Sequence, residues 1–329
     1  MKVSLIMTVF NAEKFLPKIL KNVFKQKFLD FELVAINDGS TDDSLNILKQ
    51  FSAVEPRLKV ITQCNKGIGP ARQNGIDNSV GEYIGFIDCD DEISDLLLED
   101  NYNLINKYFG DIILFGYSRY FPERKKSIKE SPAEEILFFK SNEEFGRNFL
   151  SLNRGSDLGF AWNKLIRRSF LVDNNLSFSN AKTDDDAIFM YKVFQKVQRV
   201  IVNPKIYYRY YMRKSSLSHH ITDLNSFEKN IRIRRITALK MFDKWGLKYN
   251  YVTGHNDIRL IDVKFRQVFF ENKATMNIIR LSHHLMKSEE IKTIRQVLKK
   301  NFFRLNLKDR LYFIAVQMRM YFVLYLYDK

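Results

Sequence analysis

The stretch that decides the fold is residues 83–91, which read YIGFIDCDD. Its first five residues form the kind of apolar run that is typical of a buried strand in a parallel sheet. Asp88, Asp90 and Asp91 follow at once. Because packed carboxylates repel one another unless a cation lies among them, this strand end predicts a Mg²⁺ or Mn²⁺ site. Asp91 is expected instead to cap a helix around residues 93–103, since an N-cap needs only one acceptor.

Upstream of this stretch, strand-like and helix-like segments alternate. Apolar runs at residues 3–9, 31–36 and 58–62 indicate strands, whereas the apolar residues between 12 and 25 recur with a helical period. This alternation predicts an α/β fold with a mostly parallel sheet flanked by helices. Ligands of such sheets bind at the carboxyl ends of the strands, so chemistry is expected there.

Polar residues follow each of these strands. The first strand ends in the run Thr8 to Asn11, which includes Phe10, the second ends at Asp38, and the third is followed by a segment that contains Arg72. Asn, Asp, Gly and Ser are also ordinary turn residues, so a single motif of this kind indicates little. Four in succession favour a ligand site over turn chemistry.

Composition limits the class of protein. The chain has 329 residues, of which 45% are hydrophobic, and it can bury a sizeable core. Its two cysteines, Cys64 and Cys89, indicate neither a disulfide framework nor a zinc site. The N-terminal apolar run is short and no cleavage site follows it, so a cytoplasmic protein is expected.

The net charge of +15 is concentrated in the last third of the chain. Between residues 221 and 329, 22 Lys and Arg residues stand against 10 Asp and Glu residues. Such a region suits an anionic partner, for which a membrane surface, an acidic glycan and nucleic acid are the candidates. The alternative is a basic face that is simply solvated and binds no partner.

The pattern is helical from about residue 222, and it ends in an apolar, aromatic run at 311–327 that contains Gln317 and Arg319. This run is too short for a transmembrane helix, and polar residues interrupt it. It suits a helix at the inner face of the cell membrane or against a partner chain, with a core helix of a small bundle as the alternative. Residues 121–150 are polar and charged, which predicts a flexible surface excursion.

Four segments carry a resemblance to a known family: TVFNAEKFL (8–16), INDGSTDDSLNIL (36–48), NKGIGPARQNGI (65–76) and GEYIGFIDCDDEI (81–93). In order and spacing they resemble the N-terminal half of bacterial glycosyltransferase family 2. The resemblance implies a GT-A fold, which is Rossmann-like. It also implies an inverting enzyme that uses a nucleoside-diphosphate sugar, by default a UDP-sugar, and Mn²⁺ or Mg²⁺.

The resemblance also implies roles for the polar residues at the strand ends. Thr8 and Phe10 are expected to line the nucleobase pocket. Asp38 is expected to contact the base, and Arg72 to lie near the base or the phosphates. Two residues depart from the family pattern: Thr8 replaces a frequent proline, and Asn37 a frequent aspartate.

Asp88 and Asp90 occupy the positions of the family's Asp-x-Asp motif. Asp88 is expected to face the ribose or the metal, and Asp90 to be the metal ligand. Further along, YYRYYMRKSSLSHH (207–220) resembles a basic family stretch. There Arg213 or Lys214 is expected to contact the diphosphate, because cationic donors stabilise phosphate oxygens, and His219 and His220 are candidate metal ligands. A pair of surface histidines is the alternative.

Two further segments supply the acceptor side. FAWNKLIRR (160–168) resembles the stretch that precedes the acceptor site, and TDDDAIF (183–189) resembles the Glu-Asp-x-x-Phe motif. Alignment on Phe189 puts Asp186 at the position of the general base, with Asp185 as the alternative. An inverting transfer needs one such carboxylate beside the acceptor hydroxyl. The expected acceptor is a glycan, or a lipid-linked or protein-linked group, in bacterial surface polysaccharide or glycoconjugate synthesis.

The expected organisation is a GT-A catalytic domain over residues 1–220, followed by a basic helical region over 221–329. Within the first, residues 1–100 form the nucleotide-sugar half and 101–220 the acceptor half. No G-x-G-x-x-G follows the first strand and no G-x-x-x-x-G-K-[ST] occurs, which excludes Rossmann dehydrogenases and P-loop NTPases. A non-catalytic basic protein that binds nucleotides or nucleic acid is the alternative function. No groove-reading or base-stacking motif favours nucleic acid as a partner.

Overall fold

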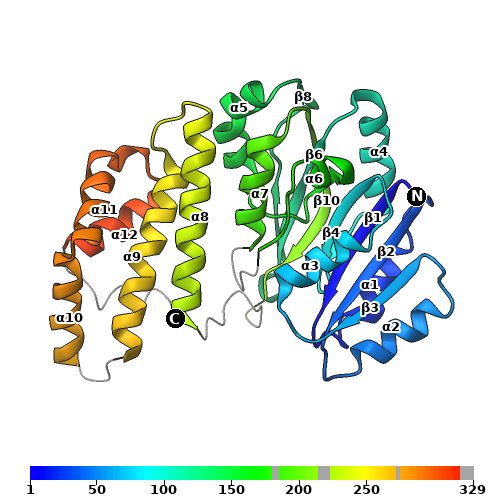
Figure 1. Ribbon diagram of the computed structural model, residues 1–329, viewed down its shortest axis with the longest axis horizontal. Coiled ribbons are helices and arrows are strands. Elements are labelled where there is room, and N and C mark those ends of the chain that lie inside the picture. Colours follow the sequence, from blue (N-terminus) through cyan, green and yellow to red (C-terminus); the bar gives the residue numbers. More distant parts are fainter. Residues whose placement is uncertain (180–184, 214–222, 272–274, 319–329) are drawn as a thin grey trace. The chain divides into compact units, whose positions relative to one another are not determined.

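The computed structural model of the chain describes residues 1–179, 185–213, 223–271 and 275–318. The chain divides into two compact units, Met1–His219 and His220–Lys329. The first unit contains the sheet and the second is helical (Figure 1).

The sheet of the first unit has ten strands among the described residues. The main path runs β3-β2-β1-β4-β9-β6-β10-β5, with β7 beside β6 and β8 beside β10. From β3 to β4 the strands are parallel, β9 is antiparallel to β4 and β6, and β10 is parallel to β6. The bounds are β1 Val3–Val9, β2 Phe31–Asp38, β3 Leu58–Gln63, β4 Tyr83–Asp88, β5 Glu92–Ile93, β6 Ile112–Phe121, β7 Lys126–Glu130, β8 Leu137–Phe139, β9 Lys164–Arg167 and β10 Val200–Tyr211.

Helices flank this sheet, as the sequence predicts. Right-handed crossovers put α1 and α2 on one face and α3 on the other. The close approach of α3 to β1 requires Gly75, since a Cβ there would lie 2.3 Å from Ile6 Cγ2. The predicted α/β fold is thus confirmed. The bounds are α1 Leu16–Val23, α2 Ser44–Ser52, α3 Ile68–Asp77, α4 Leu97–Tyr108, α5 Asn142–Gly155, α6 Arg168–Asp173 and α7 Asp185–Lys196.

The expected flexible excursion at residues 121–150 is wrong. β6 and β7 form an antiparallel hairpin that turns through a short 3₁₀ segment, and β8 and α5 follow. Glu130 holds the hairpin closed, because its carboxylate pairs with Arg119 at 3.0 Å and accepts a hydrogen bond from the Tyr117 hydroxyl. The residues of this hairpin are mostly polar and exposed, so they lack the alternation of apolar and polar residues that indicates a strand. A sequence without that alternation predicts a loop.

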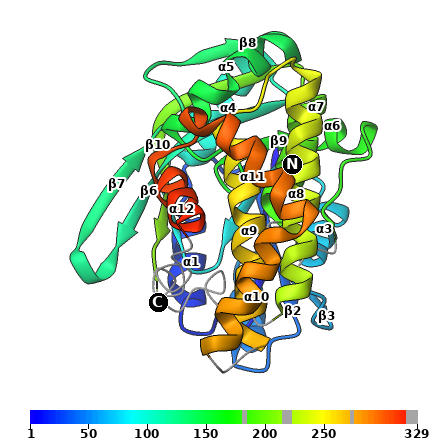
Figure 2. The same ribbon diagram turned by 90° about the vertical axis from the view of Figure 1, so that its left-hand side faces the viewer.

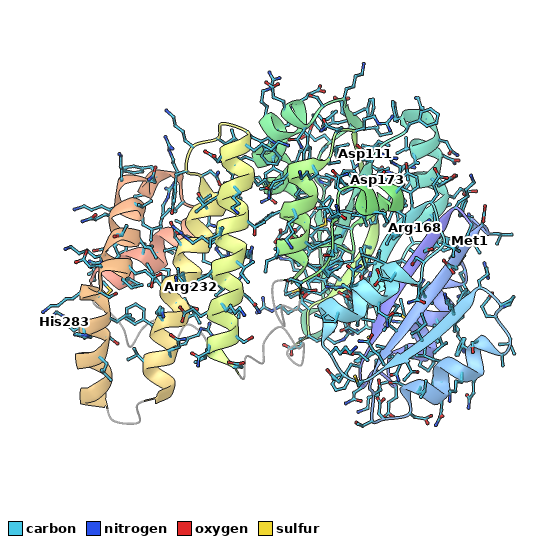
Figure 3. All side chains as sticks on the ribbon, viewed as in Figure 1. Met1, Asp111, Arg168, Asp173, Arg232 and His283 are labelled. Atoms are coloured by element: carbon cyan, nitrogen blue, oxygen red, sulfur yellow. The ribbon has the colours of Figure 1, made fainter. Side chains whose placement is uncertain are left out.

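The second unit is a bundle of helices, as expected from about residue 222 onward. Figures 1 and 2 show α8 and α9 side by side. The guanidinium of Arg232, labelled in Figure 3, pairs with Glu228 at 2.7 Å and with Glu290 at 2.8 Å, which ties α8 to α11. In the part of the chain that the structure describes, no helix is long and apolar enough to cross a membrane. The bounds are α8 Leu224–Lys244, α9 Tyr251–Glu271, α10 Thr275–Lys287, α11 Glu289–Lys300 and α12 Leu307–Gln317.

Candidate active site

The parallel strands deliver their last residues to one edge of the sheet. The register places Thr8 of β1 beside Asp88 of β4. Met1, Asp111 and Arg168, labelled in Figure 3, lie at the opposite edge, where β1 and β6 begin and β9 ends. The polar residues singled out in the first hundred positions therefore gather at the carboxyl edge.

The loops that follow β1 and β2 are tied together at this edge. Asn11 has a φ of 50°, and its side-chain Oδ1 accepts a hydrogen bond from the Thr41 amide at 2.8 Å. The Asn11 amide in turn donates to Ser40 Oγ at 3.1 Å. Beside these loops Phe10 is 39% exposed and Thr8 is partly buried. A nucleobase pocket lined by Thr8 and Phe10 stays a prediction.

Asp38 is buried at the end of β2 and holds the loop that leads into α3. Its Oδ1 accepts hydrogen bonds from Gln63 Nε2 at 2.8 Å and from the Lys66 amide at 2.9 Å. Its Oδ2 accepts one from the Gly67 amide at 2.9 Å, where a φ of 90° favours glycine. Most acceptor positions of this carboxylate are in use, so contact with the base stays a prediction.

Arg72 on α3 is shared by three carboxylates. Its Nη2 donates to Asp88 Oδ1 at 3.1 Å, and its Nη1 donates to Asp185 Oδ2 at 3.0 Å and to Asp186 Oδ1. The side chain is 4% exposed, and its guanidinium lies 5.7 Å from the centre of the Phe178 ring. One buried cation thus joins the end of β4 to the start of α7.

Burial sets the electrostatics of this cluster. Desolvation raises the pKa of Asp88 to about 6 and that of Asp185 to about 7, in each case against the opposing charge of Arg72. Desolvation acts to lower the pKa of Arg72, but the charges of Asp186, Asp185 and Asp88 outweigh it and raise that pKa. The arginine therefore stays charged.

Asp90 lies in the same turn as Asp88 and is paired with a different arginine. Its side chain is 31% exposed, and its Oδ2 accepts a hydrogen bond from Arg213 Nη1 at 2.6 Å. The guanidinium of Arg213 also lies 4.8 Å from the ring centre of Phe15 and 4.6 Å from that of Tyr211. The residue assigned to the diphosphate thus lies next to the residue assigned to the metal.

The donor atoms of this site suit a divalent cation. Asp88 and Asp90 offer hard oxygen ligands, and among the described residues four carboxylates of the site share the guanidinium groups of Arg72 and Arg213. Among the described residues, no group of three or more His, Cys, Asp or Glu side chains could hold a metal alone. Substrate phosphates commonly complete such coordination. The other candidates, His219 and His220 for the metal and Lys214 for the diphosphate, lie outside the described residues.

The expected helix-capping role of Asp91 is wrong. The N-cap residue of α4 is Leu96, and Asp91 is buried against β10 instead. Its Oδ2 accepts a hydrogen bond from Tyr208 Oη at 2.9 Å, and its Oδ1 accepts one from the Tyr211 amide at 2.9 Å. Tyr208 Oη also accepts a bond from the Asp88 amide at 3.0 Å. These bonds fix the turn that carries both candidate metal ligands.

Replacing Tyr208 with phenylalanine should destabilise this turn. The ring would keep its stacking on Trp162, at 4.3 Å between centroids, but the buried Asp91 carboxylate would lose a donor. We expect the free energy of unfolding to fall by about 1–3 kcal/mol in chemical denaturation. Tyr210→Phe on the same strand is the control, because its hydroxyl has no hydrogen bond to this turn in the described structure. Equal losses for the two variants would contradict the assignment.

Asp185 and Asp186 are the first two residues of α7, where the helix dipole favours negative charge. The side chain of Asp185 is 8% exposed and that of Asp186 is 17% exposed. Asp186 Oδ2 also accepts a hydrogen bond from the Ala161 amide at 3.1 Å. The more accessible carboxylate is thus the one predicted to be the base, although its role stays a prediction.

Sequence reasoning gave no role to two residues beneath the site. Lys164 is fully buried, its Nζ donates to the Phe160 carbonyl and to Asn163 Oδ1, and desolvation lowers its pKa to about 7. Trp162 is also buried, and it stacks on Phe160 as well as on Tyr208. Both lie in the quoted FAWNKLIRR segment, but a lysine gives no sequence signal of burial.

The first half of the chain matches a known protein family. The model described as "Glycosyl transferase family 2" matches residues 4–173, which is more than half of the chain. The chain belongs to glycosyl transferase family 2. The predicted family and enzyme class are confirmed, and the match covers the ends of β1 to β4 together with Asp88 and Asp90 of this glycosyltransferase.

Several known proteins are similar to this glycosyltransferase. The cholesterol galactosyltransferase of Borreliella burgdorferi is 28% identical over 281 residues, which cover 79% of this chain and 76% of that protein. The structure of Staphylococcus aureus TarS 1–349 in complex with UDP-GlcNAc has a TM-score of 0.65 and 21% identity, covering 98% of this chain and 88% of that one. The mannosyltransferase PcManGT from Pyrobaculum calidifontis, in complex with GDP-Man and Mn²⁺, has a TM-score of 0.56 and 13% identity, covering 97% and 86%. The two structures support the GT-A fold.

Proposed function

We propose that this glycosyltransferase is an inverting, metal-dependent enzyme with a nucleoside-diphosphate sugar, by default a UDP-sugar, as donor. Its acceptor is a hydroxyl group of a glycan or of a lipid-linked or protein-linked group in bacterial surface polysaccharide or glycoconjugate synthesis. The observation that carries this proposal is the meeting of Asp88, Arg72 and Asp186 at the carboxyl edge of the sheet. It joins the donor half of the site to the candidate base.

The donor side of the proposal rests on the strand ends and on the relatives. Thr8, Phe10 and Asp38 lie at the ends of β1 and β2, where this proposal puts the nucleoside, and Arg72 and Arg213 offer cationic donors for its phosphates. The TarS structure holds UDP-GlcNAc and the mannosyltransferase holds GDP-Man, which supports a nucleotide sugar as donor.

The transfer itself needs one base. Asp186 accepts the proton of the acceptor hydroxyl as that oxygen forms a bond to the anomeric carbon. The bond from this carbon to the diphosphate oxygen breaks on the opposite side, and the electron pair leaves with the nucleoside diphosphate. The geometry is that of inverting glycoside hydrolysis, with the acceptor in place of water. The Ala161 amide orients Asp186 for this role.

Asp88 and Asp90 would hold Mn²⁺ or Mg²⁺ in this enzyme. A bound ion of this kind neutralises the charge that the leaving diphosphate gains. The Mn²⁺ in the mannosyltransferase structure supports a divalent metal. Arg213 beside Asp90 serves the same end, since its guanidinium can donate to a phosphate oxygen as it now donates to the carboxylate.

Replacing Asp90 with alanine should weaken the metal-dependent part of donor binding. We expect the affinity for UDP in the presence of Mn²⁺ to fall about 10–100-fold, as is usual when metal sites lose a ligand or its support, and the affinity without Mn²⁺ to change little. Asp95→Ala is the matched control, because this exposed carboxylate pairs with Lys27 at 4.0 Å and has no predicted role in metal binding. If Asp90→Ala binds UDP like the wild type with Mn²⁺, Asp90 is not a metal ligand.

A donor screen tests the proposed function as a whole. The full chain is incubated with a panel of UDP-sugars and GDP-sugars plus Mn²⁺, and the released nucleoside diphosphate is measured. Turnover of one donor with a glycan or lipid acceptor, with inversion at the anomeric carbon, is expected. The alternative, a non-catalytic basic protein that binds nucleotides or nucleic acid, predicts binding without release from any donor.

A further inference from the structure

Helix α12 carries an exposed apolar stripe. The side chains of Leu307, Leu311 and Ile314 are 71%, 60% and 40% exposed, and Met318 directly after the helix is 65% exposed. A spacing of three and four residues puts them on one side of the helix. Phe303, in the turn before it, is 84% exposed. This stripe belongs to the second unit of the chain.

The other side of α12 is fixed in the core of its own unit. Phe313 and Val316 are buried in the cluster formed with α8, α9 and α11. Asp309 is also buried, and its carboxylate lies 3.1 Å from His255 Nδ1 and accepts a hydrogen bond from Asn306 Nδ2 at 2.8 Å. Rotation of α12 would break these contacts, so the apolar stripe cannot turn inward.

Basic residues rim the stripe. The segment KKNFFRLNLKDR (299–310) contains five Lys and Arg residues and one acidic residue, which is the buried Asp309. At 100° per residue, Lys308 lies on one side of the stripe and Arg310 on the other. Arg310 is held there by hydrogen bonds to the Leu305 carbonyl at 2.9 Å and the Phe303 carbonyl at 2.6 Å.

We propose that α12 docks this protein on the surface of an anionic lipid bilayer, with the stripe in the headgroup–acyl boundary. Apolar side chains with a rim of cations match this boundary, because the side chains enter the acyl region while the cations meet lipid phosphates. The aromatic and basic sequence that follows, RMYFVLYLYDK (319–329), has the composition of interfacial segments. A second copy of the chain suits the stripe less well, because a two-fold contact would bring two basic rims together.

Flotation of the full chain with vesicles tests this proposal without reference to enzyme activity. The vesicles are phosphatidylcholine alone, or phosphatidylcholine with phosphatidylglycerol. We expect flotation with the anionic vesicles, and a loss of it at about 1 M salt, where charges are screened within a few ångströms. Leu311→Glu and Ile314→Glu should each lower the partition coefficient at least about tenfold, since each removes apolar burial and adds a repelled charge.

Matched controls separate this effect from a general loss of apolar surface. Val54→Glu and Val172→Glu change side chains of the first unit that are 81% and 59% exposed, and both variants should float like the wild type. All four positions are exposed, so unchanged thermal unfolding is expected throughout.

Two outcomes would overturn the proposal. One is flotation of Leu311→Glu and Ile314→Glu equal to that of the wild type. The other is no flotation of the wild type with anionic vesicles at low salt. In the second case light scattering distinguishes a dimer that Leu311→Glu dissociates, in which a second copy covers the stripe, from a monomer whose stripe has no lipid partner.

Discussion

Asp186→Asn should abolish sugar transfer while leaving nucleotide binding nearly intact. Asparagine keeps the shape of the side chain and can still accept the bond from the Ala161 amide, but it cannot take the proton of the acceptor hydroxyl. Loss of a general base typically costs about 10²–10⁴-fold in turnover, and we expect kcat to fall by that much. Released nucleoside diphosphate gives kcat, and calorimetry gives the affinity for UDP.

Asp185→Asn is the matched control for this experiment. It makes the same chemical change one residue away, on a side chain that is less exposed and also bound to Arg72. We expect a smaller loss of kcat than for Asp186→Asn. If Asp186→Asn keeps full activity and Asp185→Asn loses it, the base is Asp185.

Arg72→Met should cause the largest loss of stability. The change would leave Asp88 and Asp185 without the cation that they share, and breaking a buried ion pair by removal of one partner costs about 3–5 kcal/mol. We expect a decrease of this size in the free energy of unfolding at neutral pH, measured by chemical denaturation. Arg57→Met is the control, because Arg57 pairs with Glu55 at 2.8 Å at a more exposed site and should cost less.

The loss of stability in Arg72→Met should also depend on pH, and the pKa values of Asp88 and Asp185 determine the direction of that dependence. The folded-state pKa values of Asp88 and Asp185, about 6 and about 7, already exceed the ordinary value, and removal of Arg72 raises them further. Protonation therefore favours the folded state. The stability of the variant should be highest below about pH 4, the ordinary range of these groups, and should fall as the pH rises through the folded-state values. A loss that is the same at pH 4 and pH 8, or no larger than that of Arg57→Met, would contradict the shared-cation account.

Much of the first half of the fold could be predicted from the sequence. Four apolar runs, each followed by polar residues, indicate β1 to β4, because buried parallel strands leave a continuous hydrophobic signal. The hairpin of β6 and β7 could not be predicted in this way, since its exposed residues lack that signal. The insertion of antiparallel β9 between β4 and β6 depends on packing over a long stretch of chain, which periodicity does not record.

In the candidate site, too, the sequence predicts individual residues but not the contacts between them. Motif spacing singles out Asp88, Asp90 and Asp186 individually, but it does not show that Arg72 joins two of them. That contact depends on α3 and α7 lying close together, which tertiary structure alone decides. The role of Asp91 could not be predicted for a related reason, because its partner Tyr208 comes from β10, far along the sequence.

Calorimetric titration of UDP into the full chain, with and without Mn²⁺, tests the central claim most directly. The account predicts that UDP binds and that Mn²⁺ tightens this binding, because Asp88 and Asp90 would hold the metal between the protein and the diphosphate. Absence of binding by UDP, GDP and every other nucleoside diphosphate, with or without Mn²⁺, would contradict it.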